Sequence, residues 1–532
     1  MDTILQHPAT TPANPAVDAT RPVAVLDIGA SAIRLLVAEL VPDGAPRILE
    51  EASRGVLLGK ETFTHGRLGP ATMDAALKAL EGFRSIMDGY GVLRYRAVAT
   101  SAVREATNSD SFLDRVRLRT GLEVEIIDGT EENRLTYLAV RRALGAHAVL
   151  TGGNALLVEI GGGSGDLSFL RKGEPLQSGT YALGALRMRQ NLSAWHGKHA
   201  DGVRLLRRHI RNVVEDIRRD IPMREVQHFI ALGGDVRFAA ARIASDTSHP
   251  PGYRTITREA FFAFHDEIVA LEVEELRDRY RLPVVDAETL APALMVYREL
   301  LAETAATEVV VPDASLRAGL MLDLAGASEG RGFEDLRAQV LTSAAALGEK
   351  YRYDAAHARQ VAVLATGLFD ELRVEHGLSE RQRLLLEVAA LLHDVGIFVG
   401  LRDHHLHGQY VLSHAEIFGL SQDDMAIVGN LVRYHRGEMP SRAHPEFVAL
   451  DRDERVDVMK MAALVRVANA LDADHLQKVR AVRLLRESEP WVLEADGAGD
   501  FTMERLAALS RADLFTDVYG RKLAFRESGT TP

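Results

Sequence analysis

The sequence lacks the features that define several common classes of protein. Its 532 residues include no cysteine, which excludes disulfide bonds, thiolate metal sites and cysteine catalysis. No apolar run approaches the roughly 18 residues of a membrane-spanning helix, so we expect no membrane span. Residues 1–20 contain neither lysine nor arginine and lack the charged and apolar regions of a signal peptide. We therefore expect a disordered N-terminal tail and a cytoplasmic location.

The charge is acidic overall, with 63 Lys and Arg residues against 75 Asp and Glu residues and a net charge of −12. This balance argues against DNA as a partner, because nucleic-acid binding depends on basic surfaces. Any polyanionic substrate must instead meet a local basic patch. The composition, 47% hydrophobic and 26% charged, is that of a globular protein with an ample core. The length predicts about three or four domains.

The most informative stretch is L-L-V-E-I-G-G-G-S-G-D at residues 156–166. Its apolar residues predict a short buried strand, and a buried acid such as Glu159 is costly without a partner such as a metal ion. Glycines lack Cβ atoms, so successive backbone N–H groups can turn inward around an anion. A glycine-rich hairpin turn is the alternative. We interpret the stretch as a phosphate-binding loop of Gly161, Gly162, Gly163 and Ser164, with Glu159 and Asp166 as metal ligands.

A related unit, V-A-V-L-D-I-G-A-S-A-I-R-L-L-V, lies upstream at residues 23–37. It again has an apolar strand, an acid, a glycine turn and a second apolar run. Such a unit occurring twice indicates two related half-domains that face each other across a cleft, as in actin-like ATPases and sugar kinases. The pattern adds Asp27 to the candidate metal ligands, and Gly29 and Ser31 to the candidate phosphate-binding residues.

Two polar segments between these units offer catalytic groups. Arg104 lies at a predicted strand-to-helix junction, where a guanidinium can fork onto a phosphate; a surface ion pair is the alternative. Glu132 lies in G-T-E-E-N-R-L at residues 129–135, in the predicted first turn of a helix. It can act as a general base facing the cleft, or it can be one of two acids that the helix dipole favours.

Further along the chain, H-F-I-A-L-G-G-D at residues 228–235 predicts a strand that ends at Gly233 and Gly234, a turn that often borders a phosphate site. A predicted helix at 201–219 carries several arginines on one face, which we expect to be solvated rather than to track polyphosphate. These are Arg204, Arg207, Arg208 and Arg211. Glycines around 326–332 mark a linker, and the chain beyond it is predicted to be almost entirely helical.

The chain resembles the exopolyphosphatase / guanosine pentaphosphate phosphohydrolase family over roughly residues 22–480. The shared motifs occur in family order: V-L-D-I-G, G-R-L at 66–68, A-V-A-T-S-A-V-R-E-A-T-N at 97–108, G-T-E-E-N-R-L, E-I-G-G-G-S, and S-L-R-A-G-L at 315–320. The resemblance implies Mg²⁺ dependence and a homodimer. It also implies removal of the terminal phosphate from inorganic polyphosphate, or of the 5′ γ-phosphate from guanosine pentaphosphate.

The resemblance also assigns roles to individual residues. Glu132 matches the family's catalytic glutamate, Arg104 a phosphate-contacting arginine, and Asp27 the acid of the first lobe. The family's usual G-S-N-S is Gly29-Ala30-Ser31-Ala32 here, which loses side-chain donors to phosphate. The usual aspartate and glutamate at the two ends of the second loop are exchanged in Glu159 and Asp166. Each exchange moves a carboxylate by about 1.5 Å, so we expect an altered rate or metal preference.

The helical region resembles the HD-type domain that longer family members append. The resemblance implies a metal site of a first histidine, a His-Asp pair and a distant aspartate, which His357, His393 and Asp394 fit in part. The distant position is Asn469, and a neutral amide is a poor substitute for a carboxylate at a divalent metal. Asp472, one turn on, can replace it. We expect a structural or dimerising role for this domain in preference to a working metal site.

The predicted fold is α/β, with two actin-like (ASKHA, ribonuclease H-like) lobes around a cleft, an all-α HD-like domain and a small C-terminal α+β domain. The predicted parts are a tail at 1–20, lobe I at 21–138, lobe II at 139–326, the helical domain at 333–480 and the last domain at 481–532. Rival functions are a kinase or ATPase of the same superfold and a non-catalytic sensor of guanosine polyphosphates.

Overall fold

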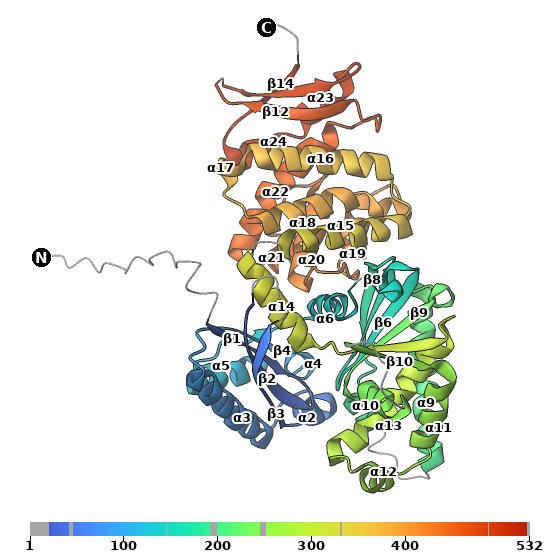
Figure 1. Cartoon of the computed structure of the whole chain (residues 1–532). Coiled ribbons are helices and arrows are strands. Elements are labelled where there is room, and N and C mark those ends of the chain that lie inside the picture. The colour runs from blue at the N-terminus through green and yellow to red at the C-terminus, as the bar shows by residue number, and fades with distance from the viewer. Residues whose placement is uncertain are drawn as a thin grey trace, which may run out of the picture. The chain divides into compact units, whose positions relative to one another are not determined.

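The computed structural model describes residues 21–41, 46–145, 147–191, 199–244, 252–329, 332–487 and 489–528. The predicted tail at 1–20 lies outside these residues. The chain forms two compact units (Figure 1). Unit 1 consists of residues 1–167 and 180–332, and unit 2 of residues 168–179 and 333–532.

The first lobe of unit 1 is built on a five-stranded sheet with the order β3-β2-β1-β4-β5. Strand β1 pairs antiparallel with β2 and parallel with β4, so the sheet opens with a hairpin and continues through crossover helices. The strands are β1 (Pro22–Ile28), β2 (Ala32–Glu39), β3 (Arg47–Gly55), β4 (Arg94–Ala99) and β5 (Glu125–Ile126). Short helices α2 (Leu58–His65) and α4 (Ser101–Arg104) follow β3 and β4.

The alternation of side chains along β1 decides which way its acid faces. Ala24 and Leu26 pack in the core with helices α3 (Pro70–Gly89) and α5 (Ser109–Thr120). Val23 and Val25 pack on the opposite face, with residues of α6 (Gly129–Leu144) and α14 (Leu316–Glu329). Because successive side chains of a strand point to opposite faces, Asp27 lies on the α6 side of the sheet.

The second lobe repeats this topology. Its six-stranded sheet has the order β10-β11-β9-β6-β7-β8, in which β8-β7-β6-β9-β11 corresponds to the order of the first sheet and β10 adds an antiparallel edge. The predicted pair of related, actin-like lobes is thereby confirmed. The strands are β6 (Asn154–Ile160), β7 (Gly165–Arg171), β8 (Glu174–Tyr181), β9 (His228–Leu232), β10 (Tyr253–Thr257) and β11 (Glu308–Pro312).

Helices of the second lobe complete its core around this sheet. Helix α13 (Val284–Ala302) is almost wholly buried, whereas α9 (His199–Asp220) is amphipathic. The others are α7 (Ala148–Thr151), α8 (Ala185–Asn191), α10 (Gly234–Ile243), α11 (Arg258–Val269) and α12 (Val273–Tyr280), with a 3-10 turn, η1, at Met223–Glu225.

A buried histidine in α11 makes the stability of this lobe sensitive to acid. The His265 side chain is fully buried and its Nε2 has no hydrogen-bond partner among the residues that the structure describes, although Nδ1 lies 2.8 Å from Asp266 Oδ1. Burial lowers the pKa of His265 from 6.5 to about 4, against the raising effect of Asp266. The pKa of His265 is thus lower in the folded state than in the unfolded state. Its contribution to the free energy of unfolding is therefore fully present above about pH 6.5, and about 3 kcal/mol of stability is lost as the pH drops to about 4.

Replacing His265 by leucine should therefore flatten the acid side of the stability profile. The difference in free energy of unfolding between about pH 7 and about pH 4 should shrink by about 3 kcal/mol, measured by denaturant titration. His209→Gln, at an exposed position of α9, is the matched control and should keep the wild-type slope. An unchanged slope in His265→Leu would mean that His265 is not the group responsible.

Unit 2 is mainly helical. Its helices pack around one continuous hydrophobic core that runs from Val340 to Phe515. The helices are α15 (Gly332–Lys350), α16 (Ala355–Glu371), α17 (Arg373–His376), α18 (Glu380–Leu392), α19 (His404–Leu412), α20 (Gln422–Tyr434), α21 (Pro445–Val448) and α22 (Arg452–Ala470), with a 3-10 turn, η2, at Val395–Phe398.

The C-terminal residues form a three-stranded sheet with the order β12-β13-β14. Strands β12 (Val479–Leu485) and β13 (Trp491–Gly497) are antiparallel, whereas β14 (Leu523–Glu527) is parallel to β13 and is reached through α23 (Thr502–Ser510) and α24 (Asp513–Tyr519). Leu484, Leu493 and Phe515 belong to the same core as the helices.

Two of the predicted domain boundaries fall inside elements. The boundary between residues 138 and 139 lies within α6, and the boundary between 480 and 481 lies within β12. Residues 168–179, which form most of the β7–β8 hairpin, belong to unit 2, where Ser343 Oγ lies 3.3 Å from the Leu176 carbonyl oxygen. Among the described residues, no helix combines the length and apolarity needed to cross a membrane.

Candidate active site

Each lobe contributes the same strand-to-strand turn to the site. Asp27 is the penultimate residue of β1, and Glu159 holds the same place in β6. A glycine directly follows the last residue of each strand, and its N–H closes the turn. Gly29 donates to the Ala32 carbonyl at 3.1 Å and Gly161 donates to the Ser164 carbonyl at 3.0 Å. The repeated motif in the sequence is therefore a repeated hydrogen-bonded turn.

The two turns leave backbone donors free. Within the described part of the chain, the N–H groups of Gly162, Gly163 and Ser164 have no hydrogen-bond partner, and neither have those of Ala30 and Ser31. A Cβ on Gly162 would lie 2.8 Å from Ser31 Oγ, so the two turns approach each other closely. Unpaired amides on two facing turns form an anion-binding concavity.

Hydroxyl groups fix the two acids of the second turn. Asp166, at the start of β7, accepts hydrogen bonds from Thr180 Oγ1 at 2.8 Å and Ser164 Oγ at 3.0 Å. Glu159 accepts one from Thr136 Oγ1 at 2.8 Å. Despite the exchange of aspartate and glutamate at these positions, both carboxylates are therefore held by side chains of the same site.

Adjacent acids in the first turn of α6 have different surroundings. Arg104 Nη1 donates to Glu132 Oε1 at 2.8 Å and also to the Ile127 carbonyl. Glu131 instead pairs with Arg96 and Arg134, at 3.0 and 2.7 Å, and these arginines also bind Asp323 of α14. Glu131 is thus part of an ion-pair network that joins α6 to α14. Glu132 is outside this network and pairs with Arg104.

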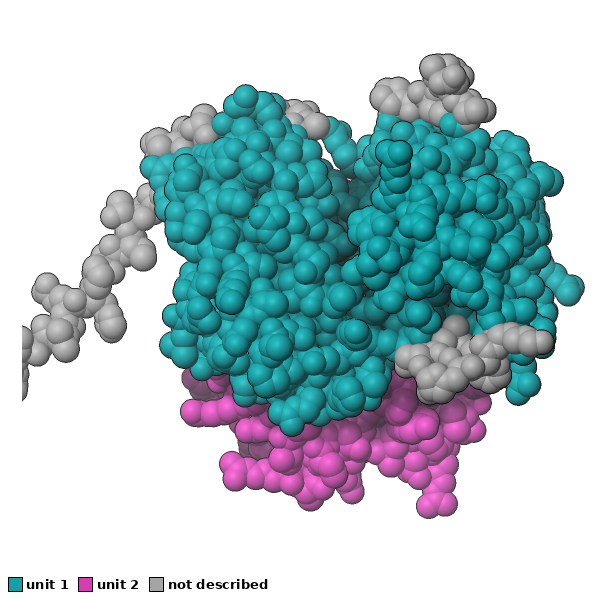
Figure 2. All heavy atoms as spheres, turned by 90° about the horizontal axis from the view of Figure 1, so that it is seen from below, with its two compact units in different colours: residues 1–167, 180–332 teal, residues 168–179, 333–532 magenta. Residues whose placement is uncertain are grey.

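The two turns, their acids and Glu132 line one cavity of about 320 Å³ in unit 1, whereas Arg104 reaches it through its hydrogen bond to Glu132. Figure 2 shows the furrow between the two halves of unit 1, in teal. The candidate residues that line the cavity are Asp27, Gly29, Ser31, Glu132, Glu159, Gly161, Gly162, Gly163, Ser164, Asp166, Gly233 and Gly234. Gly233 and Gly234 lie where β9 meets the N-terminus of α10.

The structure adds residues that sequence reasoning missed. Three cationic side chains line the cavity, namely Arg34, Arg237 and Arg317, together with the hydroxyl of Ser101. Arg34 Nη1 lies 3.4 Å from Asp27 Oδ2. The three arginines supply the local basic patch that a polyanionic substrate needs on an otherwise acidic protein. Arg317 lies inside the shared S-L-R-A-G-L motif, which was the available signal for it.

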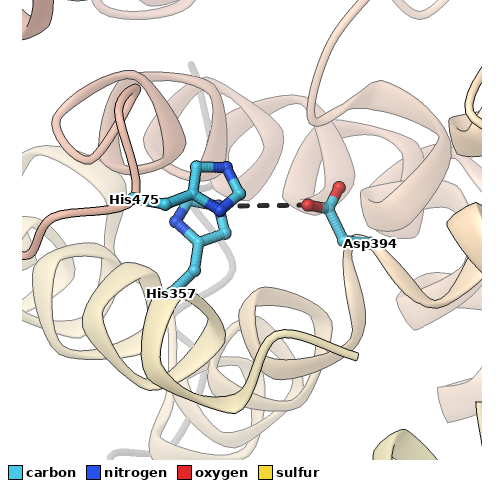
Figure 3. A group of neighbouring side chains, drawn as sticks. All are labelled: His357, Asp394 and His475. Atoms are coloured by element: carbon cyan, nitrogen blue, oxygen red, sulfur yellow. Dashed lines mark ion pairs between the residues drawn. The ribbon is translucent and has the colours of Figure 1, made fainter. Parts of the chain in front are cut away.

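Other predicted residues lie elsewhere. Arg207 and Arg211 of α9 pair with Glu299 of α13, at 3.4 and 2.7 Å, so these arginines are engaged in ion pairs within the lobe. His357, His393 and Asp394 lie together in unit 2, where Figure 3 shows Asp394 facing His357. Asp472 accepts a hydrogen bond from His357 Nδ1 at 2.8 Å, so it lies behind the imidazole ring and does not share its Nε2 side.

Comparison with known proteins decides the family. The model of the Ppx/GppA phosphatase family matches residues 36–328, and that of Ppx/GppA phosphatase domain III matches residues 341–515. The chain belongs to the Ppx/GppA phosphatase family. The guanosine-5′-triphosphate,3′-diphosphate pyrophosphatase of Vibrio parahaemolyticus serotype O3:K6 is 25% identical over 487 residues, which cover 89% of this chain and 91% of the relative.

Two further relatives of this Ppx/GppA protein match a smaller share of it. Exopolyphosphatase 1 of Mycobacterium leprae is 36% identical over 164 residues, 31% of this chain and 47% of the relative. The crystal structure of an exopolyphosphatase from Cytophaga hutchinsonii ATCC 33406 superposes with a TM-score of 0.53 at 23% identity, over 58% of this chain and 98% of the other. That similarity supports the two-lobed fold.

The acids of the Ppx/GppA cleft suit a cation. Burial raises the pKa of Asp27 and Glu159, and burial together with the Glu159 charge raises the pKa of Asp166 to about 6. Burial and the Asp166 charge raise the pKa of Glu132 well above its usual value, although the Arg104 charge and hydrogen bond act to lower it. Each of the four carboxyl groups thus binds protons more readily than in water, as expected of carboxyl groups that burial withdraws from solvent. Oxygen ligands in this number fit Mg²⁺.

Proposed function

We propose that this chain is a Mg²⁺-dependent phosphoanhydride hydrolase that removes the terminal phosphate from inorganic polyphosphate. The observation that carries the proposal is the position of Glu132. Its carboxylate lines the same cavity as the two turns with free amides, accepts a hydrogen bond from Arg104, and is close enough to Asp166 for their charges to interact. The printed names of the relatives, exopolyphosphatase 1 and guanosine-5′-triphosphate,3′-diphosphate pyrophosphatase, support this class of reaction and make guanosine pentaphosphate a second candidate substrate.

Each group of residues in the cleft has its own role in the proposed reaction. Free amides of the Gly29 and Gly161 turns bind the anionic oxygens of the phosphate chain. A water oxygen attacks the terminal phosphorus, Glu132 takes a proton from that water, and the bond from phosphorus to the bridging oxygen breaks. The raised pKa of Glu132, caused first by burial, makes its carboxylate a stronger base than a glutamate in water. Arg104 stabilises negative charge on the transferred group.

A divalent cation fits beside this machinery. Asp27, Glu159 and Asp166 would hold Mg²⁺, and when bound the ion would offset charge on the phosphate oxygens. Thr136, Thr180 and Ser164 keep the acids in place through the hydrogen bonds described above. Localisation in the cytoplasm and a homodimeric state remain expectations of the sequence that accompany this proposal.

Phosphate release from long-chain polyphosphate and from guanosine pentaphosphate tests the proposal. Release from at least one substrate should require Mg²⁺ and stop when EDTA removes it, because buried acids without a cation repel the substrate. The products distinguish the substrates: orthophosphate with shortened polyphosphate, or orthophosphate with guanosine tetraphosphate. Tight binding of guanosine pentaphosphate with no turnover under any divalent metal would refute hydrolysis and favour a sensor. Transfer of phosphate from ATP to a small molecule would favour a kinase.

A further inference from the structure

The turn that follows β6 is held from behind by helix α8. Three successive carbonyl groups of this turn, those of Gly161, Gly162 and Gly163, accept hydrogen bonds from residues of α8. The backbone N–H of Ala185 donates to the first at 2.9 Å, and the backbone N–H of Arg187 donates to the second at 3.0 Å. The third carbonyl accepts a hydrogen bond from the Arg187 side chain, whose Nε lies 2.7 Å away.

These three contacts decide where the amides of the turn point. In a trans peptide, the carbonyl of one residue and the N–H of the next point in nearly opposite directions. Carbonyl groups held towards α8 therefore direct the N–H groups of Gly162, Gly163 and Ser164 away from it. These are the amides that have no partner within the described part of the chain, and all three residues line the cavity. The free amides are thus a consequence of the hydrogen bonds behind them.

One of the three amides depends on a side chain. The first two carbonyl groups are bound by backbone N–H groups of α8, which every residue except proline can supply. The third is bound by the guanidinium of Arg187. Without that bond, the peptide between Gly163 and Ser164 can rotate, because a glycine accepts most backbone angles. The direction of the Ser164 N–H therefore depends on Arg187.

Arg187 is itself held by the first lobe. Its Nη2 donates to the carboxylate of Glu105, the residue that directly follows Arg104 at the end of α4. Its guanidinium also lies over the ring of Phe63 in α2, 4.1 Å from the ring centroid. A planar guanidinium can stack on a ring and donate hydrogen bonds in its own plane at the same time. One side chain of the second lobe thus contacts its own turn and two helical segments of the first lobe.

The surrounding contacts show that the two lobes pack closely at this place. A Cβ on Gly163 would lie 2.2 Å from Ser101 Oγ and 2.4 Å from Phe63 Cζ. Gln190, near the end of α8, donates through Nε2 to the Lys60 carbonyl of α2 at 2.7 Å. The turn and α8 of the second lobe therefore form one junction with α2 and α4 of the first.

Arg187 acts from outside the cavity. Among the described residues, those that line the cavity include Arg34, Arg237 and Arg317 but not Arg187. The Arg187 side chain is 20% exposed and its partner Glu105 is 42% exposed. An ion pair that is partly open to water contributes little stability and is screened by salt, so it can break and re-form as the lobes move. Arg187 is therefore suited to position the turn, not to bind the substrate.

We propose that Arg187 positions the Ser164 amide for phosphate and links that position to closure of the cleft. While Glu105 and Phe63 hold the guanidinium, the Gly163 carbonyl is bound and the Ser164 N–H faces the cavity. When the first lobe moves away, Arg187 loses both of these contacts and holds the turn less firmly. The inference rests on the proposed function, because it takes phosphate oxygens as the ligand of the turn.

Binding of tripolyphosphate tests the positioning role. Affinities are measured by calorimetry with Mg²⁺ in full chains that carry Glu132→Gln, so that the probe is not consumed. Arg187→Met should weaken binding by about 10–100-fold, the effect of one hydrogen bond to a charged group. Arg219→Met, at an exposed ion pair of α9, is the matched control and should leave the affinity unchanged. Unchanged affinity in a folded Arg187→Met chain would overturn the proposal.

A lysine at the same position separates charge from geometry. Arg187→Lys keeps the positive charge and the length of the side chain but lacks the planar fork that bridges the Gly163 carbonyl, Glu105 and the ring. It should weaken tripolyphosphate binding nearly as much as Arg187→Met does. Full affinity in Arg187→Lys would show that only the charge is used, and would overturn the positioning role.

The peptide itself can be observed by nuclear magnetic resonance. Gly163 and Ser164 form the only Gly-Ser pair in the sequence, so ¹³C-carbonyl glycine combined with ¹⁵N-serine labels this peptide alone. In the Glu132→Gln chain, tripolyphosphate should move the Ser164 amide proton downfield, and Arg187→Met should abolish that shift. A general loss of stability would not remove one amide shift from a folded protein. No shift while Arg187 is present, or an equal shift without it, would overturn the proposal.

The link to the first lobe has its own test. Glu105→Gln should weaken tripolyphosphate binding by about 2–5-fold when Arg187 is present and have no further effect in the Arg187→Met chain. Additive effects would refute the link. Phosphate release by the wild type is measured separately. If release is absent while the Arg187-dependent shift is present, the hydrolase function fails and this inference stands; release without the shift has the opposite meaning.

Discussion

Glu132→Gln should lower the rate of phosphate release from polyphosphate by about 10²–10⁴-fold, the range that a positioned general base contributes. The amide of glutamine keeps the shape of the side chain and can still accept a hydrogen bond from Arg104, but it cannot take a proton from water. Substrate binding should persist, because the free amides of the Gly29 and Gly161 turns are unchanged. Initial rates and equilibrium binding of the same polyphosphate measure the two effects separately.

The stability of this variant distinguishes loss of chemistry from loss of structure. Burial and Asp166 raise the pKa of Glu132, which shows that its negative charge is unfavourable in the folded cleft. Glu132→Gln should therefore unfold at the wild-type temperature or above it. The matched control is Glu131→Gln, which removes ion pairs with Arg96 and Arg134 and should lower stability while keeping the turnover of folded protein. Wild-type turnover in Glu132→Gln would exclude Glu132 as the base.

The parts of the site that the sequence predicts are those carried by local patterns. Asp27 and Glu159 stand at the ends of strands before glycine turns, and strand, acid and turn are all visible within about ten residues. The same local repeat predicted two related lobes. Both Glu131 and Glu132 lie in the first turn of α6, and only the pairing of Glu131 with Arg134, three residues on, was visible locally. The partners Arg96 of Glu131 and Arg104 of Glu132 come from other elements, so the choice between the two acids needed tertiary information.

The residues that hold the acids in place, and the arginines of the cavity, could be predicted only with tertiary information, with one exception. Thr136 follows Glu132 by four residues, so helix periodicity alone places it on the same face and could have predicted its role. Thr180 meets Asp166 only because β7 and β8 fold back on each other, which requires the turn of the hairpin to be known. Arg34 and Arg237 come from different lobes and meet only in the cleft.

Two histidines of unit 2 show the same limit more strongly. His404 and His435 are visible in the sequence, but Nε2 of one lies 3.3 Å from Nε2 of the other only in the folded unit, where α19 packs closely on the chain around Gly396. A Cβ on Gly396 would lie 1.9 Å from the His404 carbonyl oxygen. The parallel pairing of β13 with β14 is similarly non-local, since two helices separate these strands. For that reason the last fifty or so residues gave little information on their own.

Gly184→Ala should reduce phosphate release by about 10²-fold, because the substitution displaces the phosphate-binding turn. A Cβ on Gly184 would lie 2.2 Å from the Gly163 carbonyl carbon and 2.5 Å from the Gly162 carbonyl oxygen, which are backbone atoms and cannot rotate away. Overpacking of this kind costs about 1–3 kcal/mol, so the chain should still fold.

Gly82→Ala in α3 is the matched control, since nothing lies within 4 Å of the added Cβ. The control should gain about 0.5–1 kcal/mol of stability and keep full activity. Rates of phosphate release and unfolding midpoints of both variants test the prediction, and a fully active Gly184→Ala enzyme would show that this turn does not bind the substrate.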